Sequence, residues 1–182
     1  MTHLSIFSDS EKETLVRLPY HVAMFISRAD STQSHDETED EINAFTRIIK
    51  VLPNLYEGIP LIQEIFSETH ARQEEWSKWA DEKIIVQEKC AESVTYLKQK
   101  AEPEEASAYA RAIHEVADTV ARAVAEAGAF EIHHVPDRGL MKIIYNAMQA
   151  IGMTSGKSVS AISAKEQAAI SEVDAALGLV HH

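Results

Sequence analysis

Residues 101–130 read AEPEEASAYARAIHEVADTVARAVAEAGAF, and this stretch carries the clearest helical pattern in the chain. Pro103 stands near the first helical position, where a missing N–H is tolerated, and the acidic residues that follow suit the positive end of the helix dipole. Apolar residues then recur every three or four positions: Ala106, Ala110, Ile113, Ala117, Val120 and Val124. The spacing predicts an amphipathic helix whose small alanines allow a neighbouring helix to approach closely.

The same period runs through the rest of the chain, and no segment shows the alternation typical of a strand. Capping-box pairs predict helix starts at Ser8, Thr38 and Ser163, and Gly178 is a natural C-terminal stop. Helices are expected over residues 8–29 with a kink or short break at Pro19, over 37–52 until Pro53, over 60–100 as one element or two in succession, over 138–151 and over 164–177. We therefore expect an all-α fold, a single-domain compact bundle of about six to eight helices spanning residues 1–182, with two halves meeting near residue 100.

The composition is that of an acidic globular protein. Of 182 residues, 45% are hydrophobic, and 29 acidic against 17 basic side chains give a net charge of −12. That charge disfavours nucleic acid and anionic lipid headgroups as partners, whereas a cation or another protein is compatible. Apolar runs are too short for a membrane span, no signal peptide is visible, and the single cysteine, Cys90, permits a reducing compartment. We expect a cytoplasmic protein.

An acidic stretch, RADSTQSHDETEDEINAF at residues 28–45, is the candidate metal site. Its proposed ligands are Asp30, Glu37, Asp40 and Glu41, because Glu37 and Glu41 lie one turn apart on a helix with Asp40 beside them. Hard carboxylate oxygens favour weakly bound Ca²⁺, Mg²⁺ or Mn²⁺. The stretch is no EF-hand loop, since His35 stands where the sharp turn needs glycine. The alternative is an ordinary solvated helix start with acids at the positive end of the dipole.

Two histidine motifs give a second candidate. HEVAD at residues 114–118 lacks the second histidine of a zinc-protease helix, and His114, Asp118 and Arg122 instead form a polar stripe expected to face water. EIHH at residues 131–134 has the Glu-x-x-His spacing of di-iron bundles, but no second such pair occurs. A metal role here requires Glu131 and His134 to converge with His114.

The arrangement of these pieces resembles the TerB-like family, all-helical proteins linked to tellurite resistance and stress. The resemblance rests on AMFISRADS at residues 23–31, VARAVAEAGAF at 120–130 and VSAISAKEQAAISEVDAALGL at 159–179. It implies a compact helical fold and divalent-cation binding by Asp30 and the acids of residues 37–41. Ser31 replaces the family's usual glycine, and Gly128 stands where the second half would have its aspartate.

Three functions follow as hypotheses. The leading one is a non-enzymatic cytoplasmic helical protein, acting as a cation-responsive or stress-related scaffold module. The first alternative is a metal-dependent hydrolase or oxidase that uses Glu131, His134 and His114. The second alternative is a ligand-free interaction domain that binds a protein partner or a second copy of itself.

Overall fold

A computed structural model describes residues 3–29, 35–128 and 162–179, with the backbone alone described at 35–41, 44 and 123–128. Helices dominate this part of the chain, and no strand occurs in it, so the all-α prediction is confirmed. The elements are the 3₁₀ helix η1 (His3–Ile6), α1 (Asp9–Ser27), α2 (His35–Leu55), α3 (Pro60–Ala71), the 3₁₀ helix η2 (Gln73–Glu75), α4 (Trp76–Ala80), α5 (Val86–Lys100), α6 (Pro103–Gly128) and α8 (Ala164–Leu177). The helix predicted over 138–151 lies outside the described residues.

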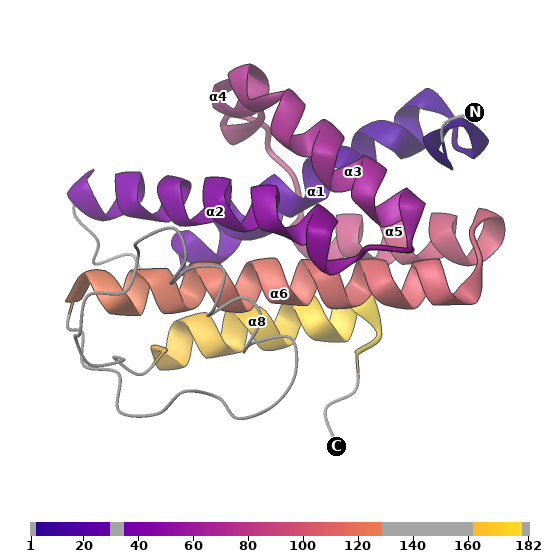
Figure 1. The fold of residues 1–182 in the computed structure, drawn as a ribbon. Coiled ribbons are helices and arrows are strands. Elements are labelled where there is room, and N and C mark those ends of the chain that lie inside the picture. Colours follow the sequence, from indigo (N-terminus) through magenta and orange to yellow (C-terminus); the bar gives the residue numbers. More distant parts are fainter. Residues whose placement is uncertain (1–2, 30–34, 129–161, 180–182) are drawn as a thin grey trace.

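Helices α1 and α6 occupy the centre of the bundle. α2 and α8 lie along α6 on opposite sides, while α1 crosses behind it and also packs against α3, α5 and α8 (Figure 1). Between residues 108 and 121, α6 is buried over most of its circumference, which is wider than the predicted stripe. The buried α6 residues are Ala108, Tyr109, Ala110, Ala112, Ile113, Val116, Ala117, Thr119, Val120 and Ala121. Elements from both sides of residue 100 thus share one core.

α1 begins as predicted, with a complete capping box between Ser8 and Glu11. Pro19 does not break it, and the helix continues to Ser27. A proline has no N–H to donate to the carbonyl four residues earlier, which is that of Leu15. The buried Tyr109 hydroxyl of α6 donates to this Leu15 carbonyl at 2.9 Å. The buried Thr69 hydroxyl of α3 donates to the next carbonyl, that of Val16, at 2.7 Å. The Tyr109 hydroxyl therefore takes the place of the donor that Pro19 lacks, and the Thr69 hydroxyl adds a bond to the neighbouring carbonyl.

Two predicted boundaries on α2 are wrong. The helix begins at His35, so Thr38 lies inside it and is not the N-cap. It also continues past Pro53 to Leu55. Pro53 has no N–H to donate to the carbonyl of Ile49, so the last turn continues with one backbone hydrogen bond fewer. Gln63 of α3 donates to the Pro53 carbonyl at 3.1 Å, which ties the end of α2 to the next helix.

Residues 60–100 form more elements than expected. α3 begins at Pro60 and α5 ends at Lys100, as predicted, but η2, the short α4 and a non-helical segment at 81–85 lie between them. The indole rings of α4 explain the interruption, because Trp76 and Trp79 are buried against Tyr20 of α1, with ring centroids 5.5 and 5.8 Å from its ring. These ring contacts hold α4 against α1 at the place where the expected long helix is interrupted.

The last helix has the predicted start and stop. Ser163 and Glu166 form a complete capping box, and Gly178 ends α8 with φ of 73°. The Gly178 N–H donates to Ala175 O and the Leu179 N–H donates to Asp174 O, the two bonds of a Schellman motif. The motif fixes the chain direction after α8 and turns Leu179 back toward the bundle.

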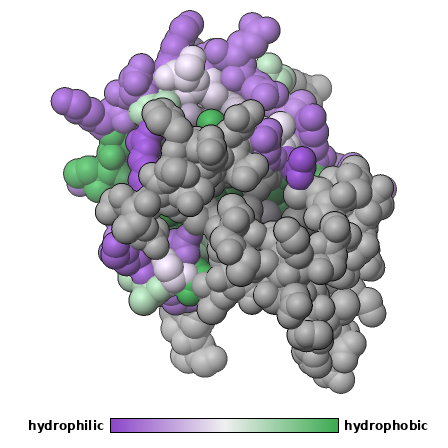
Figure 2. Space-filling view, turned by 90° about the vertical axis from the view of Figure 1, so that its left-hand side faces the viewer, coloured by the Kyte–Doolittle hydropathy of each residue, from purple (hydrophilic) through white to green (hydrophobic). Residues whose placement is uncertain are grey.

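On the face that Figure 2 shows, the described side chains are largely hydrophilic, and apolar ones occupy small separate areas. No described helix is long and apolar enough to cross a membrane.

Replacing Ala117 with leucine should destabilise the protein by about 1–3 kcal/mol, because the extra carbons must enter a fully packed helix contact. Chemical denaturation measures the change in unfolding free energy. Ala91→Leu is the matched control, since Ala91 is also inside a helix but exposed. Equal stability of the two variants would show that the alanine face of α6 is not closely packed.

Candidate functional site

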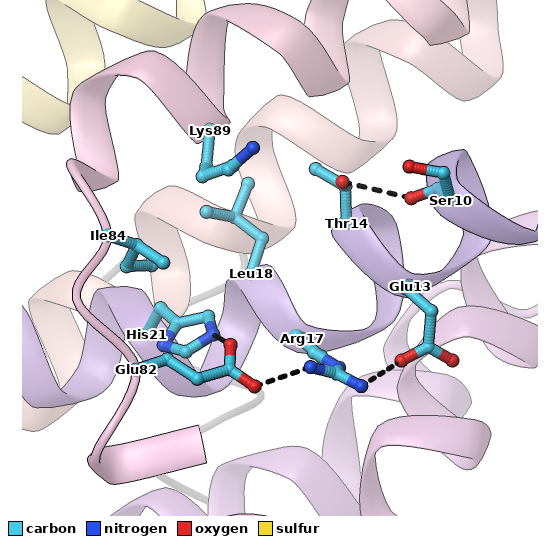
Figure 3. A pocket seen from close by; sticks show the side chains of 9 residues that line it. All are labelled: Ser10, Glu13, Thr14, Arg17, Leu18, His21, Glu82, Ile84 and Lys89. Carbon is cyan, nitrogen blue, oxygen red and sulfur yellow. Dashed lines mark hydrogen bonds and ion pairs between the residues drawn. The ribbon is translucent and has the colours of Figure 1, made fainter.

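One face of α1 carries a polar network beside a small cavity. Glu13, Arg17 and His21 are spaced four residues apart, so they lie one above another on the helix. The non-helical segment after α4 brings Glu82 to them, and α5 brings Lys89 (Figure 3). Together with neighbouring residues, these side chains line a cavity of about 160 Å³.

Ion pairs connect the charged side chains of this network. Arg17 contacts Glu13 within α1 and donates to Glu82 at 2.5 Å. Arg72 donates to Glu13 at 2.6 Å and to both carboxylate oxygens of Glu75 at 2.8 Å. Both guanidiniums also lie over Trp79, at 5.5 Å for Arg17 and 5.2 Å for Arg72. Such cation–π contacts and paired charges fix α4 against α1.

The protonation states of these side chains favour the ion pairs that hold α4 against α1. Hydrogen bonds from Arg72 lower the pKa of Glu75 to about 2 and hold the pKa of Glu13 below its usual range. Burial, aided by nearby Arg17, lowers the pKa of His21 to about 4. His21 is therefore neutral at pH 7, and its Nε2, 3.4 Å from Glu82 Oε2, meets the carboxylate without forming an ion pair. Every charged group that joins α1 to α4 already has a partner.

A second polar contact joins α6 to α8 and corrects the predicted stripe. His114 does not simply face water: its Nδ1 lies 2.8 Å from Oδ1 of Asp174, a carboxylate whose side chain is only 3% exposed. The hydrogen bond that Asp174 accepts from His114 raises the pKa of His114 above its usual value, with smaller contributions from the negative charges of Glu115 and Asp118. Asp118 accepts two bonds from Arg122 one turn away, at 2.7 and 3.0 Å.

A larger groove lies between the end of α5, the start of α6 and the end of α8. Its volume is about 440 Å³. The lining residues are Val94, Lys98, Ala101, Pro103, Ala106, Ser107, Ala110, Arg111, Leu177, Gly178 and Leu179. The walls are thus mostly apolar, and the only charged side chains among the lining residues are two cations. Neither Lys98 nor Arg111 forms an ion pair with any carboxylate that the structure describes.

The predicted metal ligands fall largely outside what the structure describes. Asp30 is not among the described residues, and Glu37, Asp40 and Glu41 are placed by backbone only, within the first two turns of α2. Glu131 and His134, the enzyme candidates, also lie outside. Among described side chains, no group of three or more His, Cys, Asp or Glu could hold a metal ion. The cation site and the enzyme alternative remain predictions.

Cys90 is packed in the core. Burial, aided by the negative charge of Asp174, raises its pKa to about 12. The thiol stays protonated at neutral pH and is a poor nucleophile there.

Sequence reasoning did not find the groove or the Arg17–Arg72 network. The only advance signal of the network was the spacing of Glu13, Arg17 and His21 on one helix face. Arg72, Glu82, Lys98 and Arg111 come from separate segments, and only the tertiary fold brings them together.

Comparisons of this chain with protein-family models, with curated proteins and with solved structures found no match.

Replacing His114 with glutamine should cost more stability at pH 5.5 than at pH 9. A histidine with a raised folded pKa contributes stability that is fully present below its unfolded pKa of about 6.5 and is lost as pH rises through the folded value. Denaturation of wild type and variant at both pH values measures the difference. His3→Gln is the control, because His3 is exposed. A pH-independent cost would contradict the pairing with Asp174.

The acidic stretch should bind Ca²⁺ or Mn²⁺ weakly, with a Kd of roughly 10⁻⁴–10⁻³ M, because it lacks a rigid glycine turn. Ion binding to the folded state alone raises the melting temperature by mass action. Titrations compare wild type with the double variant Asp30→Ala, Glu41→Ala. If millimolar ion shifts neither protein, the acids are only a solvated helix start.

Proposed function

We propose that this chain is a non-enzymatic binding module of the cytoplasm, and that its ligand occupies the groove between α5, α6 and α8. The groove carries the proposal because it has the volume and the lining of a small-molecule site. Such sites are concave, mostly apolar, and include a few polar groups that orient the ligand. Here three helices supply the apolar walls, while Lys98, Arg111 and Ser107 supply the polar groups.

The other polar region supports this choice. Where α1 meets α4, the carboxylates and guanidiniums bind one another, and both guanidiniums lie over the Trp79 ring. A ligand there would have to displace ion pairs that hold the fold together. In the groove, a ligand meets two cations without displacing any ion pair between described residues.

The cation-responsive scaffold suggested by the TerB-like resemblance is compatible with a binding module. Three of its proposed ligands, Glu37, Asp40 and Glu41, belong to the first two turns of α2, at the end of the bundle where α6 finishes, whereas the groove is formed at the start of α6 (Figure 1). The two sites would therefore be separate, and each can be tested without disturbing the other.

The neutral fluorescent probe N-phenyl-1-naphthylamine tests the groove as an apolar binding site. We expect saturable binding to the wild type, and affinity lower by on the order of tenfold, about 1.4 kcal/mol, when tryptophan fills the groove in Ala106→Trp or Val94→Trp. These two residues are half-buried and come from different walls, which reduces dependence on a single variant.

Ala91→Trp is the matched control, since Ala91 is exposed on α5 and does not line the groove. Circular dichroism and thermal melts establish that each variant is folded. Unchanged affinity in both groove-filling variants would rule out the proposed site.

A further inference from the structure

The charge of the groove is opposite to that of the whole protein. The chain has 29 acidic residues and a net charge of −12. No carboxylate of the described residues lines the groove, although Glu102, Glu104 and Glu105 are close in sequence to Pro103. Because acidic residues outnumber basic ones in this chain, a cavity whose only charged lining residues are two cations is not what random placement of charges favours. The groove is therefore suited to an anion.

The two cations differ from their neighbours on α5. Lys89 pairs with Glu92 at 2.7 Å, and Lys100 pairs with Glu11 at 2.6 Å. Lys98, which lies between them on the same helix, has no described carboxylate partner, and neither does Arg111 across the groove on α6. Among the lysines of α5, Lys98 alone lacks a described carboxylate partner, and it is the one that lines the groove.

The remaining wall is apolar and held in place. Val94 comes from α5, Ala106 and Ala110 from the first turns of α6, and Leu177 and Leu179 from the end of α8. The Schellman bonds at Gly178 satisfy the carbonyls of Asp174 and Ala175, so the end of α8 presents Leu179 to the groove with those two acceptors already occupied. An apolar chain would bury surface against these side chains.

We propose that the groove binds a single-chain carboxylate amphiphile, with the carboxylate at Lys98 and Arg111 and the hydrocarbon tail against the apolar wall of α6 and α8. The inference rests on the proposed function and adds the class of ligand. A guanidinium and an ammonium together bind a carboxylate by charge-assisted hydrogen bonds, which are stronger than bonds between neutral groups. The tail contributes by burial of apolar surface.

Displacement of N-phenyl-1-naphthylamine separates the contribution of the ligand's charged head group from that of its hydrocarbon tail. Three competitors of equal chain length are compared: octanoate, 1-octanol and octyltrimethylammonium. Octanoate should displace the probe at a concentration on the order of tenfold lower than octanol, and the cationic amphiphile should be the weakest. Raised salt should reduce the advantage of octanoate, because the cations are exposed and salt screens them.

The double variant Lys98→Gln, Arg111→Gln should lose the preference for octanoate over octanol and keep its affinity for the neutral probe. Arg47→Gln with Lys50→Gln is the matched control, because both residues are exposed on α2 and outside the groove. This control double variant should keep the preference.

If the probe binds in the groove but octanoate and octanol compete equally, or if the Lys98, Arg111 double variant keeps the preference, the carboxylate inference is wrong while the binding module stands. If the groove-filling tryptophans do not weaken the probe, the binding module itself is wrong.

Discussion

The hydrogen bond from the Tyr109 hydroxyl to the Leu15 carbonyl fixes the crossing of the two central helices. Pro19 removes the N–H that would normally serve this carbonyl, and a buried carbonyl without a partner is costly. Tyr109 is fully buried, and burial raises its pKa, so the hydroxyl keeps the proton that it donates. The Leu15 carbonyl therefore has no backbone donor within α1, and its donor comes from outside the helix. The Tyr109 hydroxyl of α6 supplies it, with 2.9 Å between the two oxygens.

Much of the remaining architecture depends on this contact. Tyr109 lies between Ala106 and Ala110, so the bond that holds α6 to α1 also fixes the turns of α6 that form the groove. Further along α6, small and branched residues allow α2 and α8 to pack on opposite sides, and Asp174 reaches His114 from α8. On the other side of the proline, Tyr20 receives both indoles of α4, and the Arg17–Arg72 network closes over Trp79. The groove is therefore a product of helix packing around α6, with no loop of special sequence behind it.

Local signals in the sequence predicted the features that local physics controls. The capping boxes at Ser8 and Ser163, the start at Pro103 and the stop at Gly178 involve residues within one helical turn of each other, and the structure has all four. Some predictions were wrong where a distant residue decides the outcome, whereas the capping box at Thr38 failed because α2 already begins at His35. Pro19 was expected to kink or interrupt a helix, but the helix is not interrupted, and the Leu15 carbonyl that lacks the proline's donor is bonded by a residue 94 positions away. His114 was placed on a solvated stripe because Asp174, 60 positions later, is invisible to periodicity. The groove was not predicted for the same reason. In the sequence, Lys98 and Arg111 are ordinary exposed cations, and only the folded chain places them in one cavity that no described carboxylate lines.

A double-mutant cycle on Pro19 and Tyr109 tests the central contact most directly. In the wild-type background, Tyr109→Phe removes the donor and leaves the Leu15 carbonyl buried without it, which should lower the unfolding free energy by about 1–3 kcal/mol. In a Pro19→Ala background, the backbone N–H of the new alanine can serve the same carbonyl within the helix, so Tyr109→Phe should cost clearly less. Equal costs in the two backgrounds, measured by chemical denaturation, would contradict the account, because they would mean that the tyrosine hydroxyl does not replace the donor that proline lacks.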